Sequence, residues 1–400
     1  MGNFFSTFEP SNNNNQRRGG VGFNINRETN NRVVVSENPK LSYYSNVTKH
    51  CNSKYGNVSI HVGQLEQREV IIKRIKKYNS TLVQQEIEVL GKLVCHPNIL
   101  RYFYKVHDDQ FLYLVFESYS SSLANYFKNE HIRQNFPIKR IMKDISKGVD
   151  YLNKLRILHL NINLENVVVL YESRSNMFTA KLANFEFALE LNEQRNVKLI
   201  KIPGGIENFQ APEVLYNKTA NIASDIYSMG CLFFTLNCSG HIMEQIIYPQ
   251  QEQRITTKLY MLKQNNSSNT LCAHLITEML KYDGLKRINT LLILQHPYFF
   301  SSQQDLIFIL DAHKMIESKN DNFKRLLFIN SKVVIGRTGS WRDQVDESVL
   351  KLLMILKKAH CSRVGSEISD DQPKGNILNL IQTIRNSVSF FNYSLFNRLL

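Results

Sequence analysis

The spacing of apolar and polar residues predicts strands in the front part of the chain and helices further along. Residues 69–73 are mostly β-branched and residues 111–116 are apolar and aromatic, so both are predicted strands. Between them, residues 82–93 carry Leu and Ile at helical spacing. Further helices are predicted over residues 138–152, 224–236, 271–280 and 290–294. A strand-rich part followed by a helical part is typical of a two-lobed α+β architecture.

Changes in composition divide the chain into three parts. Residues 1–45 contain a polar tract at 11–15 and few apolar residues, so we expect a flexible arm there. Residues 46–300 contain the predicted strands and most of the helices, and 301–400 form a further, largely helical part. Gly2 and Ser6 fit the N-myristoylation pattern, and an unmodified start is the alternative. An acylated Gly2 would bring the chain to a membrane surface, although one myristoyl chain binds weakly.

Composition and charge narrow the class of protein. The 400 residues are 43% hydrophobic and 21% charged, which excludes a wholly disordered chain. No apolar run reaches about 18 residues, so we expect no transmembrane helix. Six scattered cysteines favour a reducing, cytoplasmic compartment over a disulfide scaffold. A net charge of +14 favours anionic partners such as RNA, although a solvated basic surface explains it equally well.

Short stretches between residues 70 and 287 resemble, in order, the signature motifs of protein kinases. They are Val70–Lys73, Glu86, His96–Leu100, His159–Asn166, Asn184–Glu186, Ala211–Glu213, Ser224–Gly230 and Arg287. The resemblance implies a bilobal kinase-like fold and an ATP or ADP site. It assigns Lys73 to the α- and β-phosphates, Glu86 to an ion pair with Lys73, and Gly56 and Asn166 to the same site.

Several residues differ from the kinase pattern at the positions that carry out phosphoryl transfer and bind metal. Asn161 stands where the catalytic loop has its Asp, and Asn163 where it has a Lys. Asn184 replaces the Asp that would bind metal, and Gly56 is the only glycine left in the Gly-rich loop. Phosphoryl transfer needs a carboxylate near the attacking hydroxyl and another on Mg²⁺. The pattern therefore favours a pseudokinase, argues against Mg²⁺, and leads us to assign no metal ligand. It leaves nucleotide binding open, because Lys73 and Glu86 could also be an ordinary ion pair.

The last hundred residues resemble the ribonuclease extension of two kinase-linked families. These are the inositol-requiring kinase/endoribonuclease of the unfolded-protein response and the oligoadenylate-activated ribonuclease. The resemblance rests on residues 305–311, 333–336, 341–343 and 376–386. It implies an all-helical ribonuclease-like domain over 301–400. Trp341, the only tryptophan, is a candidate contact for RNA.

The expected ribonuclease residues are only partly present. The family cleaves RNA without metal, and by position Arg385 would be the cation that stabilises the phosphorane, with Asn386 beside it. Phe390 stands where the family has a His, and Asn379 where it has an Asp. Phe390 cannot transfer a proton, and Tyr393 is the nearby candidate to replace it. The resemblance therefore implies a degenerate ribonuclease-like domain.

Three functions remain open from the sequence. The first is a pseudokinase signalling module, nucleotide-responsive and homodimeric like its relatives, fused to the degenerate ribonuclease-like domain. The second is an active, metal-independent RNA endonuclease regulated by the kinase-like domain. The third is an atypical Ser/Thr kinase that uses unusual residues.

Overall fold

The fold is described from a computed structural model. It describes residues 32–35, 38–53, 56–77, 80–128, 136–191, 197–198, 209–237 and 267–301. The chain divides into two compact units, Met1–Met261 with Ala273–Leu294, and Leu262–Cys272 with Gln295–Leu400. Gly2, Trp341, Arg385, Asn386 and Tyr393 lie outside the described residues. The helical domain expected over 301–400 lies outside them too, except for its first residue.

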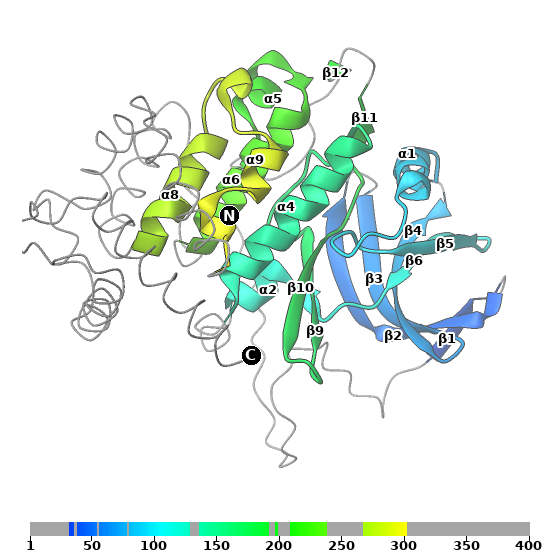
Figure 1. The fold of residues 1–400 in the computed structure, drawn as a ribbon. Coiled ribbons are helices and arrows are strands. Elements are labelled where there is room, and N and C mark those ends of the chain that lie inside the picture. The colour runs from blue at the N-terminus through cyan, green and yellow to red at the C-terminus, as the bar shows by residue number, and fades with distance from the viewer. Residues whose placement is uncertain are drawn as a thin grey trace, which may run out of the picture. The chain divides into compact units, whose positions relative to one another are not determined.

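A six-stranded antiparallel sheet forms the front part of the first unit, in the order β1-β2-β3-β4-β6-β5 (Figure 1). Its strands are β1 Arg32–Val35, β2 Asn38–Ser53, β3 Gly56–Leu65, β4 Arg68–Lys76, β5 Tyr102–His107 and β6 Phe111–Glu117. Helix α1 (Ser80–Lys92) connects β4 to the last two strands. These elements confirm the predicted strands at 69–73 and 111–116 and the predicted helix at 82–93.

The sheet begins earlier than the sequence pattern indicated. Residues 32–35 and 38–45 lie in β1 and β2, so they do not belong to a flexible arm. Val35, Leu41 and Tyr43 are buried in a core cluster with Val70 and Val115. The prediction of a flexible arm is therefore wrong for residues 32–35 and 38–45. The apolar residues of this stretch are few, and Val35, Leu41 and Tyr43 are buried against strands that follow later in the chain, whereas Val34 is exposed.

Helices dominate the rest of the first unit, as predicted. They are α2 Leu123–Lys128, α4 Ile138–Lys154, α5 Pro212–Asn217, α6 Ile222–Asn237, α8 Ser267–Met279, α9 Thr290–Leu294 and the 3₁₀ turn η4 Gly284–Lys286. Of these, α8 begins in the second unit. Helix α6 is buried from Ser224 to Leu236, because its sequence is apolar on every side. The turn η5, Pro297–Phe299, lies in the second unit.

Short strands position the segments that meet at the site. They are β7 Ser121–Ser122, β8 Ile157–Leu158, β9 Val167–Glu172, β10 Met177–Leu182, β11 Leu189–Glu190, β12 Val197–Lys198 and β13 Thr219–Ala220. The stretch around Ile99 forms a bridge to Leu182 at the end of β10, and the Leu100 N–H donates to the Leu182 carbonyl at 2.8 Å. Gly148 of α4 lies beside the same stretch. A Cβ there would come within 2.9 Å of the Asn98 carbonyl oxygen, so only glycine allows this approach.

No helix among the described residues is long and apolar enough to cross a membrane.

Candidate nucleotide and active site

A buried ion pair joins the sheet to helix α1. Lys73 lies on β4, and its Nζ donates to Glu86 Oε1 at 3.1 Å and to Oε2 at 3.0 Å. The Lys73 side chain is 8% exposed and that of Glu86 is fully buried. Because a buried charge is stable only when it is paired, each side chain fixes the position of the other.

Asn184 connects this pair to the segment after β10. Lys73 Nζ donates to Asn184 Oδ1 at 3.0 Å, across 111 residues of sequence. The amide nitrogen of Asn184 donates to Asn166 Oδ1 at 3.2 Å and to Glu186 Oε1 at 3.3 Å. Asn184 has φ = 62°, a left-handed conformation that Asn adopts more readily than most residues. The sequence therefore replaces a carboxylate here with a neutral side chain that still suits the backbone.

Asn161, Asn163 and Asn166 form a neutral hydrogen-bonded loop. Asn163 Nδ2 donates to Asn161 Oδ1 at 2.9 Å, and Asn166 Nδ2 donates to the Asn161 carbonyl at 2.8 Å. Asn163 Oδ1 accepts the backbone N–H groups of Glu165 and Asn166. We call Asn161, Asn163, Asn166 and Asn184 the amide cluster. Amides reproduce the hydrogen bonds of a carboxylate and an ammonium, but an amide oxygen is too weak a base to accept a substrate proton.

His159 and Asp225 are buried and fix the position of this loop through hydrogen bonds to its backbone. Asp225 accepts the backbone N–H groups of His159 at 2.7 Å and of Leu160 at 2.9 Å. His159 Nε2 lies 3.0 Å from the Ala183 carbonyl, and its Nδ1 accepts the Asn161 N–H at 3.3 Å. Complete burial lowers the pKa of His159 to about 4, so the ring is neutral at pH 7. Burial raises the pKa of Asp225 to about 6, although the two N–H donors act in the opposite direction.

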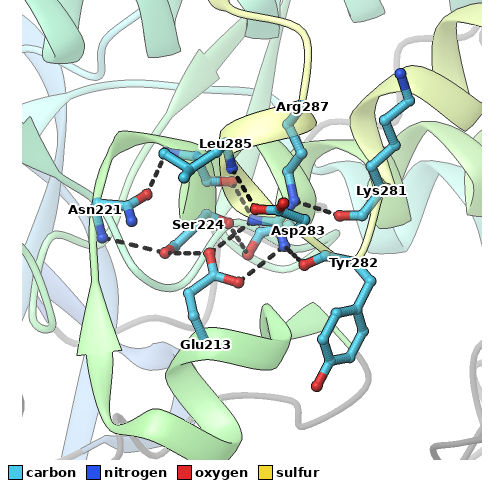
Figure 2. Close-up of polar contacts among 10 residues, drawn as sticks. Glu213, Asn221, Ser224, Lys281, Tyr282, Asp283, Leu285 and Arg287 are labelled. Carbon is cyan, nitrogen blue, oxygen red and sulfur yellow. Dashed lines mark hydrogen bonds and ion pairs between the residues drawn. The ribbon is translucent and has the colours of Figure 1, made fainter.

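A second buried ion pair, between Glu213 and Arg287, holds the helical part together (Figure 2). Arg287 donates to Glu213 Oε1 at 2.6 Å and to Oε2 at 2.8 Å. Its remaining N–H groups donate to the carbonyls of Lys281, Tyr282 and Ala223, so every donor of the guanidinium is used. Burial raises the pKa of the Glu213 carboxyl, but Arg287 outweighs it and holds that pKa below the usual value. We call Glu213, Ser224 and Arg287 the Arg287 cluster, since the Ser224 hydroxyl also donates to Glu213.

The structure brings together three of the four residues assigned to nucleotide binding. Lys73, Glu86 and Asn166 are linked through Asn184. Gly56 lies at the first position of β3, paired with Ser53 of β2. Glu186, a buried carboxylate that accepts a hydrogen bond from Asn184, was not among the residues predicted from the sequence. A charged residue two positions after Asn184, where the kinase pattern has Gly, was the signal that could have found it.

Comparison with known proteins identifies the family of residues 46–299 and several relatives. The sequence pattern of the protein kinase domain matches residues 46–299. The chain is 27% identical over 298 residues to "Serine/threonine-protein kinase/endoribonuclease ire-1" of Caenorhabditis elegans, covering 72% of this chain and 31% of that protein. It is 26% identical over 273 residues to "Serine/threonine-protein kinase/endoribonuclease IRE2" of Homo sapiens, covering 66% of this chain and 30% of that protein.

A third relative is named as an inactive protein. "Inactive serine/threonine-protein kinase/endoribonuclease IRE1-like" of Arabidopsis thaliana is 22% identical over 403 residues, covering 90% of this chain and 69% of that protein. The chain spans about a third of the length of the first two relatives.

Proposed function

Because the chain belongs to the protein kinase family, we propose that it is a pseudokinase that binds ATP or ADP without transferring phosphate. One observation carries the proposal. The positions that need carboxylates for catalysis hold Asn161 and Asn184, and both amides are engaged in hydrogen bonds, while the Lys73–Glu86 pair is formed. Members of this family typically bind ATP.

The absence of a base supports the loss of phosphoryl transfer. A substrate hydroxyl needs a carboxylate that accepts or orients its proton. The Asn161 side-chain oxygen already accepts a hydrogen bond from Asn163, and an amide takes up no proton near pH 7. The hydroxyl would therefore keep its proton, and its attack on the γ-phosphate would be slow.

The retained cation supports nucleotide binding. Lys73 is fixed by Glu86 and Asn184 at one end of the cluster, where its ammonium would meet the α- and β-phosphates. A positioned ammonium binds phosphate oxygens whether or not transfer follows. Asn166, joined to Asn184, would supply an amide beside the same phosphates.

Melting temperature with and without nucleotide tests the binding. We expect ADP and ATP at millimolar concentration to raise the melting temperature of the full chain. The double variant Lys73→Met with Glu86→Met should lose this rise. The matched control, Lys40→Met with Glu66→Met, removes an exposed pair and should keep it. No rise in the wild type would refute nucleotide binding.

Phosphate transfer from labelled ATP tests the loss of activity. We expect no labelling of the chain or of a generic protein substrate above that of the Lys73→Met, Glu86→Met variant, with Mg²⁺ or Mn²⁺. Labelling that depends on Lys73 would instead identify an atypical kinase.

A second candidate function, in RNA binding or cleavage, concerns the residues after 301. The Arabidopsis alignment covers 90% of this chain, so it must extend past residue 299 even if it starts at Met1. The ribonuclease-like resemblance of Arg385 and Asn386 belongs to this stretch. We expect the purified chain in EDTA to leave RNA uncut, because Phe390 provides no acid or base. Cleavage that is lost in Arg385→Ala, but kept in the control Arg363→Ala, would show a working nuclease.

Sedimentation of the same sample tests the expected homodimer.

A further inference from the structure

Glu186 is a buried carboxylate with an unused oxygen. The residue is 3% exposed, and its Oε1 accepts one long hydrogen bond, 3.3 Å from Asn184 Nδ2. Its Oε2 is shielded from solvent and has no hydrogen-bond partner in the described part of the chain. A carboxylate oxygen buried in this way is unfavourable unless a donor or a cation reaches it. Glu186 therefore needs a partner that the described residues do not supply.

Two oxygen atoms that could serve as metal ligands lie beside Asn184. The amide nitrogen of Asn184 donates to both, to Asn166 Oδ1 at 3.2 Å and to Glu186 Oε1 at 3.3 Å, so the two oxygens flank the Asn184 NH₂ group. Lys73 fixes this orientation, because rotating the amide would turn its NH₂ group toward the ammonium. Each oxygen has a further lone pair, and Glu186 Oε2 is free as well. Carboxylate and amide oxygens are the ligands that Mg²⁺ and Mn²⁺ prefer.

The charge of the site also calls for a cation. Lys73 is neutralised by Glu86, and no ion pair in the described ranges includes Glu186. The pair and Glu186 together thus carry a net charge of −1 when Glu186 is ionised. Nucleotide phosphates would add negative charge and repel this carboxylate. A divalent cation between them would offset the charge of Glu186 and part of the charge of the phosphates.

We propose that Glu186 and Asn166 hold a divalent cation of the Mg²⁺ or Mn²⁺ type. Glu186 then supplies, two residues along the chain, the negative charge that is missing at Asn184. The proposal rests on the proposed nucleotide site for the phosphate oxygens that would complete the coordination. The protein ligands can nevertheless be tested with metal alone.

Mn²⁺ binding to the full chain, followed by its electron paramagnetic resonance signal, tests the site. We expect Glu186→Gln to weaken Mn²⁺ binding by about tenfold or more, since it removes the only charged ligand. The control Glu190→Gln changes an exposed carboxylate four residues further on and should leave binding unchanged. If the Gln variant does not fold, Glu186→Gly removes the same charge with the residue that the kinase pattern has there. Equal Mn²⁺ binding by wild type and folded Glu186 variants would overturn the proposal.

ADP affinity, with Mn²⁺ and in EDTA, separates the metal site from the nucleotide site. We expect Mn²⁺ to tighten ADP binding in the wild type and to have a much smaller effect in Glu186→Gln. ADP binding that is tighter in Glu186→Gln under both conditions would show that Glu186 only repels phosphate, and would overturn the metal site. If ADP binds equally well with and without Mn²⁺, the nucleotide site stands and the metal site falls. If ADP never binds but Mn²⁺ binding depends on Glu186, the metal site stands and the nucleotide proposal fails.

Discussion

The amide cluster and the Arg287 cluster lie in the same unit but differ in charge. In the Arg287 cluster, a full ion pair links residues 74 positions apart, with the guanidinium buried and the Glu213 side chain 13% exposed. In the amide cluster, Asn161, Asn163 and Asn184 stand where the kinase pattern has charged residues, and they bond to one another and to their neighbours as neutral groups. Both clusters are well hydrogen-bonded, so the difference does not arise from poor packing.

The comparison separates the structural use of charge from its chemical use. The planar guanidinium of Arg287 reaches five acceptors on three segments, and no neutral side chain could reproduce that arrangement. A carboxylate that only accepts hydrogen bonds can be replaced by an amide at small cost. Proton transfer and metal binding cannot be replaced in this way. The chain therefore keeps the ion pair that holds the fold together, and it has amides at 161 and 184, where a kinase needs carboxylates for phosphate transfer.

Arg287→Ala should have the largest effect on stability. It leaves the Glu213 carboxylate, whose side chain is only 13% exposed, without its counter-charge and frees three carbonyls, so we expect a loss of about 3–5 kcal/mol in the free energy of unfolding. Urea unfolding measures the loss, and Arg174→Ala, at an exposed turn, is the control. A loss below about 1 kcal/mol would mean that the pair does not hold these segments together.

Lys73→Met should have the next largest effect on stability. It leaves Glu86 fully buried and without its counter-charge, which we expect to cost about 3 kcal/mol in the free energy of unfolding. Adding Glu86→Met should restore most of that loss, because both buried charges are then gone. If the double variant is as unstable as the single one, the loss in the free energy of unfolding comes from the packing of the Lys73 stem and not from its charge.

Acid should reveal the neutral state of His159. The pKa of His159 is lowered from 6.5 to about 4. The neutral ring therefore makes its full contribution to the free energy of unfolding above pH 6.5, and this contribution is lost as the pH falls toward 4. Between pH 7 and pH 5 this amounts to about 2 kcal/mol of unfolding free energy. Asp225, whose pKa is raised to about 6, contributes with the opposite sign in the same window, its stability being lost as the pH rises through 6.

The two contributions can be separated with a variant. His159→Phe keeps Asp225 and removes the titrating ring. We expect the wild type to lose about 2 kcal/mol more than this variant between pH 7 and pH 5. Parallel stability curves for the two proteins would show that the pKa of the ring is the same in the folded and the unfolded state.

Asn161→Asp should have the smallest effect. The new carboxylate can still accept from Asn163 Nδ2, so we expect the free energy of unfolding to change by less than about 1 kcal/mol. We also expect no phosphate transfer, because Asn184 still provides no carboxylate at the position from which a kinase holds its metal, and Glu186 lies two residues further along the chain. Transfer by the single variant, measured with labelled ATP, would mean that only the base was missing.

Local sequence patterns predicted much of the fold. The β-branched run at 69–73 and the helical spacing at 82–93 and 138–152 correspond to β4, α1 and α4. These patterns succeed because each element buries one face, and burial repeats with the period of the backbone. The strand at 32–35 and the first half of the next strand, 38–45, were missed. Their few apolar residues are buried by partners far along the chain, and a local window does not register such partners.

The sequence by itself determined which chemical groups the site contains. Amides at 161, 163 and 184 and a lysine at 73 fix what the site can donate, accept or neutralise, because those properties belong to each side chain. Only the tertiary structure decided how the groups are used. It turned the Asn184 oxygen toward Lys73, paired Asn161 with Asn163, and buried Glu186 with a free oxygen. These contacts depend on how α1, the loop after β8 and the end of β10 meet, and packing between distant segments leaves no periodic trace in the residues themselves.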